Sequence, residues 1–276
     1  MWTLTGFADE ISPELDEQLD TLADESIRFV ELRSVWNKNV LDLTDDEVEK
    51  VGAAISERGI GVSSIGSPIG KVPITEDFTP HLEKFRRALH VAKALEAPYV
   101  RVFSFFMPEG EDPTTYRNEV LGRMGTLAKE AEAARVVLVH ENEKDIYGDI
   151  PSRCLDILTQ VDSPALRVVW DAANFLQCGV VHPYQAGYEA LRPYVEYVHV
   201  KDAVLGSGTV VPAGEGDGEI RETISALHAS GFVGFFSLEP HLASSGTYSG
   251  FSGPALFGRA AGAFKNLLRQ QEIPWS

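Results

Sequence analysis

Eight short apolar segments, each followed by a longer amphipathic segment, limit the folds open to this chain more than any other feature. The apolar segments predict strands at residues 2–7, 27–33, 61–66, 99–105, 136–141, 166–171, 195–201 and 234–239. The amphipathic segments predict helices at residues 13–25, 44–58, 79–96, 113–134, 151–160, 183–192, 218–230 and 254–270. Strict alternation of strand and helix predicts parallel strands joined by helical crossovers.

The number of these units favours one parallel-sheet fold over another. The strand segments are rich in Val, Ile, Leu and Phe, as expected when helices cover both faces of a sheet. Eight units in 276 residues predict an α/β fold, the closed (β/α)8 TIM barrel, with residues 1–276 as a single domain. The alternative is an open doubly wound sheet. It is disfavoured because "GFADEIS", after the first strand, has one glycine where such sheets carry a glycine-rich phosphate loop.

Charge and composition limit the partners that this chain can bind. The net charge of -17 opposes binding to nucleic acid or to an anionic membrane, because phosphates repel an acidic surface. No apolar run reaches the ~18 residues of a membrane span, and Asp9 and Glu10 interrupt the first apolar region, so no signal peptide is expected. Cys154 and Cys178 form no CxxC pair and suit free thiols. We expect a cytoplasmic protein that acts on a small molecule.

Residues that can bind a metal end four consecutive predicted strands. In a barrel of this kind the active site lies at the carboxyl ends of the strands. Each residue alone is more often a helix cap, a surface charge or a hydrogen-bonded core histidine. Four on adjacent strands converge near the barrel axis, where crowded carboxylates are unfavourable without a cation. Three oxygen donors and one imidazole suit one divalent ion, Mn²⁺, Mg²⁺, Co²⁺ or Zn²⁺. The four residues are Glu141, Asp171, His199 and Glu239.

Three polar residues near these strand ends could assist the ligands or contact a substrate. Lys201, two positions after His199, points the same way and could reach a substrate oxygen or phosphate. Alternatively it pairs with Asp202 or with a ligand carboxylate. Asn174 could hydrogen-bond a ligand or a substrate, or cap the next helix. His241 could orient a ligand or face solvent.

Two further segments are candidates for the walls of the site. Glu31 and Arg33 end the second predicted strand and Trp36 follows, so the three could form the wall opposite the ligands and bind substrate. Alternatively, Glu31 and Arg33 form a structural ion pair beside a packed indole. The segment "GEGDGEI" at 214–220 could offer helix N-terminal amides to an anion, although an ordinary glycine-rich turn is the better interpretation.

Five motifs occur in a fixed order along the second half of the chain. They are "HENEKDIYGD" (140–149), "WDAANFLQCG" (170–179), "YVHVKDA" (197–203), "GEGDGEI" (214–220) and "SLEPHL" (237–242). In this combination the sequence, over essentially its whole length, resembles the sugar phosphate isomerases/epimerases with the xylose isomerase-like TIM barrel. The resemblance implies a single divalent metal held by Glu141, Asp171, His199 and Glu239. Dimers and tetramers are common among similar proteins, so a homo-oligomer is compatible with it.

The same barrel is also found in endonuclease IV-like DNA repair enzymes, which bind three zinc ions through additional histidines. The corresponding positions of this chain read "SSIGS", "RVFSFF", Asn174 and "GEGDGE", and none of them is histidine. Together with the net charge of -17, this argues against DNA repair.

The resemblance also implies a reaction. In epimerases similar to this chain, two metal-bound glutamates lie on opposite sides of the substrate, and Glu141 and Glu239 match them as the acid/base pair. Removing a proton beside a carbonyl forms an enediolate, which a chelating metal stabilises. We therefore expect an isomerase or epimerase of a sugar, a sugar phosphate or a small hydroxy-ketone. A metal-dependent lyase, similar to inosose or dehydroshikimate dehydratases, is the main alternative. A non-catalytic sugar-binding barrel is disfavoured, because it would have no use for a base.

Overall fold

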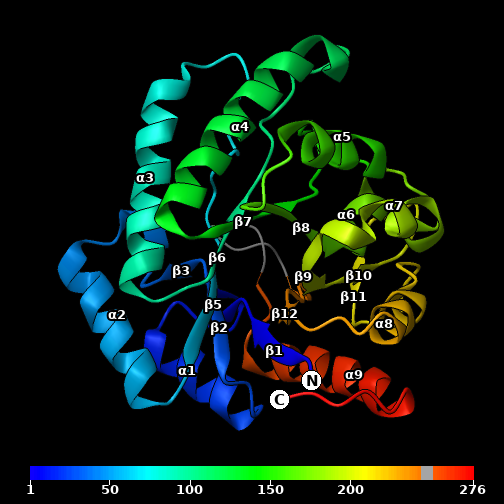
Figure 1. The fold of residues 1–276 in the computed structure, drawn as a ribbon. Helices are drawn as coiled ribbons and strands as arrows, with labels where there is room; N and C mark the ends of the chain where they lie inside the picture. Colours follow the sequence, from blue (N-terminus) through cyan, green and yellow to red (C-terminus); the bar gives the residue numbers. More distant parts are fainter. Residues whose placement is uncertain (244–250) are drawn as a thin grey trace.

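Eight parallel strands form one sheet that curls into a barrel, and helices surround it (Figure 1). A computed structural model describes residues 1–243 and 251–276. The neighbouring strands follow the order β1-β12-β9-β8-β7-β6-β5-β2. Between β1 and β2 the barrel closes through an isolated parallel bridge between Phe7 and Glu31. The predicted (β/α)8 TIM barrel is confirmed. Its strands are β1 (Thr3–Gly6), β2 (Phe29–Leu32), β5 (Gly61–Ile65), β6 (Tyr99–Val102), β7 (Val137–Glu141), β8 (Leu166–Asp171), β9 (Val195–Val200) and β12 (Phe235–Leu238).

Helices follow the strands where the amphipathic pattern predicts them. Thr44 and Glu47 form a capping box at the start of α2, which satisfies backbone amides that a helix N-terminus leaves without partners. The main helices are α1 (Leu15–Asp24), α2 (Asp45–Glu57), α3 (Phe78–Ala94), α4 (Arg117–Ala134), α5 (Pro151–Val161), α8 (Ile220–Ala229) and α9 (Pro254–Gln270). The short 3-10 helices are η1 (Ala8–Glu10), η2 (Val40–Asp42) and η3 (Pro113–Tyr116).

The segment predicted as one helix at 183–192 is instead built from three short pieces. A π-helix η4 (Tyr184–Tyr188) is followed by α7 (Glu189–Leu191) and the 3-10 helix η5 (Arg192–Tyr194). Pro193, inside η5, has no amide hydrogen and disfavours an uninterrupted α-helix.

Three small elements beside the barrel ends were not predicted from the sequence. Helix α6 (Ala172–Gln177) begins directly at the end of β8. Two antiparallel pairs join β3 (Ser34–Val35) to β4 (Lys38–Asn39) and β10 (Asp202–Ala203) to β11 (Val210–Val211). Strands of two residues are too short to produce a recognisable pattern of alternating side chains. Among the described residues, no helix is both long and apolar enough to cross a membrane.

Side chains inside the barrel change from apolar to charged along the strands. Val139, Val169 and Tyr197 form a buried cluster that Tyr99 and Phe235 also contact. Successive side chains of a strand point to opposite faces, so the residue two positions later points inward again. These later positions are Arg101, Glu141, Asp171, His199 and, one step beyond Ser237, Glu239. The two-residue period of the strands therefore places a layer of apolar side chains inside the barrel and a layer of mostly charged side chains at its carboxyl end.

Candidate metal centre

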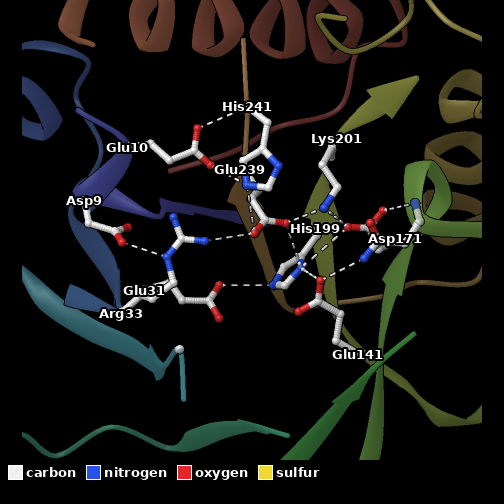
Figure 2. Close-up of polar contacts among 12 residues, drawn as sticks. Asp9, Glu10, Glu31, Arg33, Glu141, Asp171, His199, Lys201, Glu239 and His241 are labelled. Carbon is white, nitrogen blue, oxygen red and sulfur yellow. Dashed lines mark hydrogen bonds and ion pairs between the residues drawn. The ribbon is translucent and has the colours of Figure 1, made fainter. Parts of the chain in front are cut away.

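The four predicted ligands lie together at the carboxyl ends of β7, β8, β9 and β12 (Figure 2). Each offers one ligand atom, and these atoms all lie within 4.8 Å of one another. The Nδ1 atom of His199 lies 3.3 Å from Oε1 of Glu141, 3.8 Å from Oδ2 of Asp171 and 3.6 Å from Oε2 of Glu239. All four residues are buried. The convergence inferred from the strand ends is present in the structure.

Unsatisfied polar atoms in this cluster fit a divalent cation. Oε2 of Glu141, Oδ2 of Asp171 and Nδ1 of His199 are buried and form no hydrogen bond within the described part of the chain. Buried polar atoms normally have partners, and carboxylates at these distances repel one another. A divalent ion ligated by three carboxylates and one imidazole would remove both costs. The chemistry of the donor set matches the cluster typical of a metal site.

The glutamates of this cluster are held in their ionised form. Burial alone would raise the pKa of Glu141, but the positive charges of His199 and Arg101 outweigh it and lower the pKa to about 2. For Glu239, burial is likewise outweighed, chiefly by Lys201 and His241, and the pKa lies well below its usual range. Burial raises the pKa of Asp171 to about 6 despite the charge of Lys201. Both glutamates are therefore ionised at neutral pH, which is the form that binds a cation.

Lys201 contacts the ligand carboxylates. Its Nζ lies 2.9 Å from Oδ2 of Asp171 and 2.7 Å from Oε2 of Glu239. Of the alternatives open from the sequence, the pairing with ligand carboxylates is the one observed, and Asp202 lies in other contacts. The ammonium is buried, so it adds a fixed positive charge beside the two carboxylates.

Asn174 and His241 both contact candidate ligand residues. The Nδ2 atom of Asn174 donates to Oε1 of Glu141 at 3.0 Å, and its backbone amide donates to Oδ1 of Asp171 at 2.8 Å. The second bond makes Asp171 the cap of α6 as well as a candidate ligand. Nε2 of His241 lies 3.4 Å from Oε1 of Glu239 and 3.1 Å from Oε1 of Glu10. It therefore contacts a ligand instead of extending only toward solvent.

Glu31 and Arg33, predicted for the opposite wall, contact the candidate metal cluster and other groups instead of each other. Glu31 contacts the ring of His199, with Oε2 3.3 Å from Nε2. Arg33 donates from Nε to Oδ2 of Asp9 at 2.7 Å, and its Nη1 lies 3.3 Å from Oε1 of Glu239. The described ion pairs do not join Glu31 to Arg33. Trp36 is partly buried against the hydrophobic core beside the β3–β4 pair and has a positive φ of 54°.

Several residues of the site were missed in the sequence. Nη1 of Arg101 lies 3.2 Å from Oε2 of Glu141 and 3.9 Å from Oε1 of Glu239, between the two glutamates. The strand was predicted to continue to residue 105, but β6 ends at Val102, so Arg101 stands at its carboxyl end. An arginine inside an otherwise apolar strand was the available signal. Glu10 was missed because it follows β1 in a 3-10 helix, not at the strand end.

The amides of the segment 214–220 bind a carboxylate of the same chain. The backbone N–H groups of Gly214, Gly216 and Gly218 donate to Asp202 at 2.8, 3.1 and 2.9 Å, and that of Ala203 donates at 2.9 Å. A side chain at Gly216 would put a Cβ atom 2.5 Å from the carbonyl oxygen of Ala203. The glycines thus let the loop fold tightly around Asp202, which fixes the segment that follows β9.

Replacing Asp202 by alanine is expected to lower the free energy of unfolding by about 3 kcal/mol, because several amides lose a charged acceptor. Urea unfolding of the wild type and D202A measures the difference. The matched control is D217A, since exposed Asp217 accepts from one backbone amide, that of Leu205, at 2.8 Å. Its loss should stay below about 1 kcal/mol. Equal losses in the two variants would contradict a structural role for the Asp202 loop.

Comparisons with known proteins place this geometry in a family. The structure superposes on L-ribulose 3-epimerase with a TM-score of 0.76 and 16% sequence identity, over 99% of this chain and 97% of that one. It superposes on the probable 3-DHS dehydratase AsbF of petrobactin synthesis from Bacillus anthracis with a TM-score of 0.74 and 16% identity, over 96% and 98% of the two chains. At these identities the likeness shows a shared fold.

Sequence comparison supplies the family itself. The chain is 33% identical to a 2-epi-5-epi-valiolone 7-phosphate 2-epimerase from Actinoplanes sp. over 101 residues, which span 36% of this chain and 35% of the relative. The family model described as the xylose isomerase-like TIM barrel matches residues 19–267, which include all four candidate ligands. Proteins similar to this chain thus include sugar epimerases and a dehydratase. The chain belongs to the xylose isomerase-like TIM barrel family.

Proposed function

We propose that this protein is a metal-dependent isomerase or epimerase of a sugar, a sugar phosphate or a small hydroxy-ketone. The observation that supports this most directly is the pair of buried glutamates. Glu141 ends β7 and Glu239 follows β12, and the two strands β8 and β9 lie between them in the sheet. The two carboxylates therefore reach the cluster from different sides of His199 (Figure 2). Two bases that approach one point from two sides suit a reaction that removes a proton and returns one.

Each of the four candidate ligands has a role in this proposal. Glu141, Asp171, His199 and Glu239 would hold one divalent ion, which polarises a carbonyl and stabilises negative charge on its oxygen. One glutamate removes the proton from the carbon beside the carbonyl, and the C–H electrons move to form an enediolate. The other glutamate returns a proton, to the opposite face of that carbon in an epimerase or to the neighbouring carbon in an isomerase.

The cations around the glutamates would support the same step. Arg101 lies near both carboxylates, and Lys201 lies against Asp171 and Glu239. Such fixed, buried charges are suited to stabilise an oxyanion without reorganising solvent. The name of one relative supports epimerase chemistry, since a protein 33% identical over 101 residues is a 2-epimerase of a phosphorylated substrate.

A metal-dependent dehydratase is the second candidate, and the position of Lys201 favours it. Its Nζ is 2.7 Å from Oε2 of Glu239. An ammonium so close to a base is placed to donate a hydrogen bond to a hydroxyl group, which leaves as water with a proton from the medium after the base removes the carbon-bound proton. The resemblance to a dehydratase structure is one of fold and does not decide between the candidates.

Deuterium exchange distinguishes the two reactions. The metal-loaded protein is incubated in D₂O with a panel of ketoses and ketose phosphates, and the products are followed by NMR. An isomerase or epimerase is expected to introduce deuterium at the carbon beside the carbonyl and to yield the isomer or epimer without loss of water. A dehydrated product would replace our proposal by the second candidate. Exchange that persists in a variant lacking both glutamates would exclude them as the bases.

A further inference from the structure

Glu31 is a buried carboxylate whose ionic partner is the ring of His199. It lies on β2 with none of its surface exposed, and its Oε2 is 3.3 Å from Nε2 of His199. Across residues 1–243 and 251–276, no lysine or arginine nitrogen lies within the 4.0 Å of an ion pair from this carboxylate. A buried charge is unfavourable without a partner. Among the described residues, the His199 ring is therefore the group that can offer this carboxylate a positive charge.

The two nitrogens of His199 face different groups (Figure 2). Nδ1 faces the candidate ligands Glu141, Asp171 and Glu239, and Nε2 faces Glu31. An imidazole that binds a cation through one nitrogen is neutral and carries its proton on the other nitrogen, where a carboxylate can hold it. A proton kept on Nε2 leaves the lone pair on Nδ1, which is the nitrogen that faces the other ligands.

The ring is held in this orientation by aromatic neighbours. Phe7 lies edge-on to His199 with ring centroids 5.2 Å apart and planes at 75°, and Tyr197 lies 5.9 Å away at 86°. These two contacts favour the observed orientation of the imidazole. The orientation of the ring and the position of Glu31 both keep Nε2 of His199 directed at the carboxylate.

An irregularity in the sheet sets the position of Glu31. Between β2 and β5 the pairing passes from Val30–Val62 to Glu31–Ser64, so Ser63 is left out of the register. The Oγ atom of Ser63 lies 2.9 Å from the hydroxyl of Tyr197 and 2.7 Å from Oγ1 of Thr5. Bulges of this kind change the direction of nearby side chains and recur next to functional sites. Burial raises the pKa of Tyr197 well above its usual range, and the charge of Glu31 adds to the effect, which places this phenol beside the carboxylate.

We propose that Glu31 is a positioning residue for metal binding, which keeps the proton of His199 on Nε2 and thereby presents the Nδ1 lone pair to the ion. This inference rests on the proposed metal site but not on the reaction that the site performs. Carboxylates behind metal-bound histidines orient the ring and raise the basicity of the ligand nitrogen.

Mn²⁺ affinity of the metal-free full-length chain provides the test. Isothermal titration at neutral pH is expected to show about 10- to 100-fold weaker binding in E31Q and E31L than in the wild type, with the larger loss in E31L. The glutamine oxygen can still accept a hydrogen bond, so E31Q also decides the matter if E31L does not fold. The matched control is E196Q. Glu196 is another strand glutamate, at the other end of β9, where it accepts from the hydroxyl of Tyr99 at 2.9 Å. Its variant removes the same charge and should keep the wild-type affinity.

A spectroscopic measurement separates a positioning role from a general structural one. In the Zn²⁺-loaded protein labelled with ¹⁵N-histidine, long-range ¹H–¹⁵N correlations are expected to show His199 protonated at Nε2 and metal-bound at Nδ1. Wild-type affinity in E31Q and E31L, or a proton on Nδ1, would overturn the inference. If E31Q weakens Mn²⁺ binding while the wild type shows no exchange or turnover, the inference stands and the proposed function falls. Absence of Mn²⁺ binding by the wild type would overturn the inference together with the metal site.

Discussion

Replacing Glu141 or Glu239 by glutamine is expected to lower kcat by about 10²- to 10⁴-fold, the contribution typical of a positioned acid or base. Glutamine has nearly the size of glutamate but cannot accept a carbon-bound proton. Because both residues are also candidate ligands, turnover is measured at saturating divalent ion and the bound metal is determined for each variant. Substrate binding should largely survive, since the surrounding cations and Asn174 remain in place.

The two glutamates can be separated if each serves one face of the substrate. In an epimerase, E141Q and E239Q should each suppress deuterium uptake more strongly when the reaction starts from one epimer, and the favoured epimer should differ between the variants. The matched control is E143Q, since Glu143 lies two positions after Glu141 but its Oε2 contacts Lys71 at 3.0 Å. That variant should turn over at a rate close to the wild type. Wild-type turnover in both E141Q and E239Q, with metal bound, would refute the acid/base assignment.

Removing the divalent ion is expected to abolish turnover, and adding back about one equivalent per chain should restore it, as a four-ligand site requires. Without the ion, Glu141, Asp171 and His199 remain with buried atoms that lack hydrogen bonds in the described part of the chain. Dialysis against a chelator, elemental analysis and titration with Mn²⁺ or Mg²⁺ measure both quantities. The ion should also stabilise the fold, by about 2.7 kcal/mol when its free concentration is 100 times Kd.

The number of ions bound per chain distinguishes a single metal site from a three-metal site. A value near three would contradict the single site and would favour the endonuclease IV-like function that the sequence argued against. Full activity in protein shown to be free of metal would contradict the proposal for either candidate reaction. D171N is a useful companion variant, because it removes a ligand charge while its remaining oxygen can still accept from the amide of Asn174. It should bind Mn²⁺ weakly and remain folded.

The convergence of the four candidate ligands could be predicted because the position of each is fixed by local rules. A strand that ends on Glu141 or Asp171 puts that residue at the mouth of the barrel whatever the details of packing, and the two-residue period sets which side chains point inward. The positions of most strands and helices could likewise be predicted from the spacing of apolar residues along the sequence. The capping box of Thr44 is local as well, and the structure confirms it.

The residues that were missed or assigned a different role depend on contacts across the barrel. Arg101 reaches Glu239 only because β6 and β12 face each other in a closed sheet, and no sequence spacing encodes that distance. Glu31 was expected to line a wall for substrate, whereas a shifted register places it behind His199. A bulge that leaves one serine out of the pairing gives no signal in a hydrophobic pattern.

The pairing of β1 with β12 has a consequence for the way this protein is made. β1 is synthesised long before its partner β12 (Phe235–Leu238), with which it pairs along its whole length. At about 5–20 residues per second, the first strand waits on the order of ten seconds or more for that partner. The other edge of β1 closes only through the single Phe7–Glu31 bridge. The edge of β1 that pairs with β12 therefore stays without its strand partner until residues 235–238 have been synthesised.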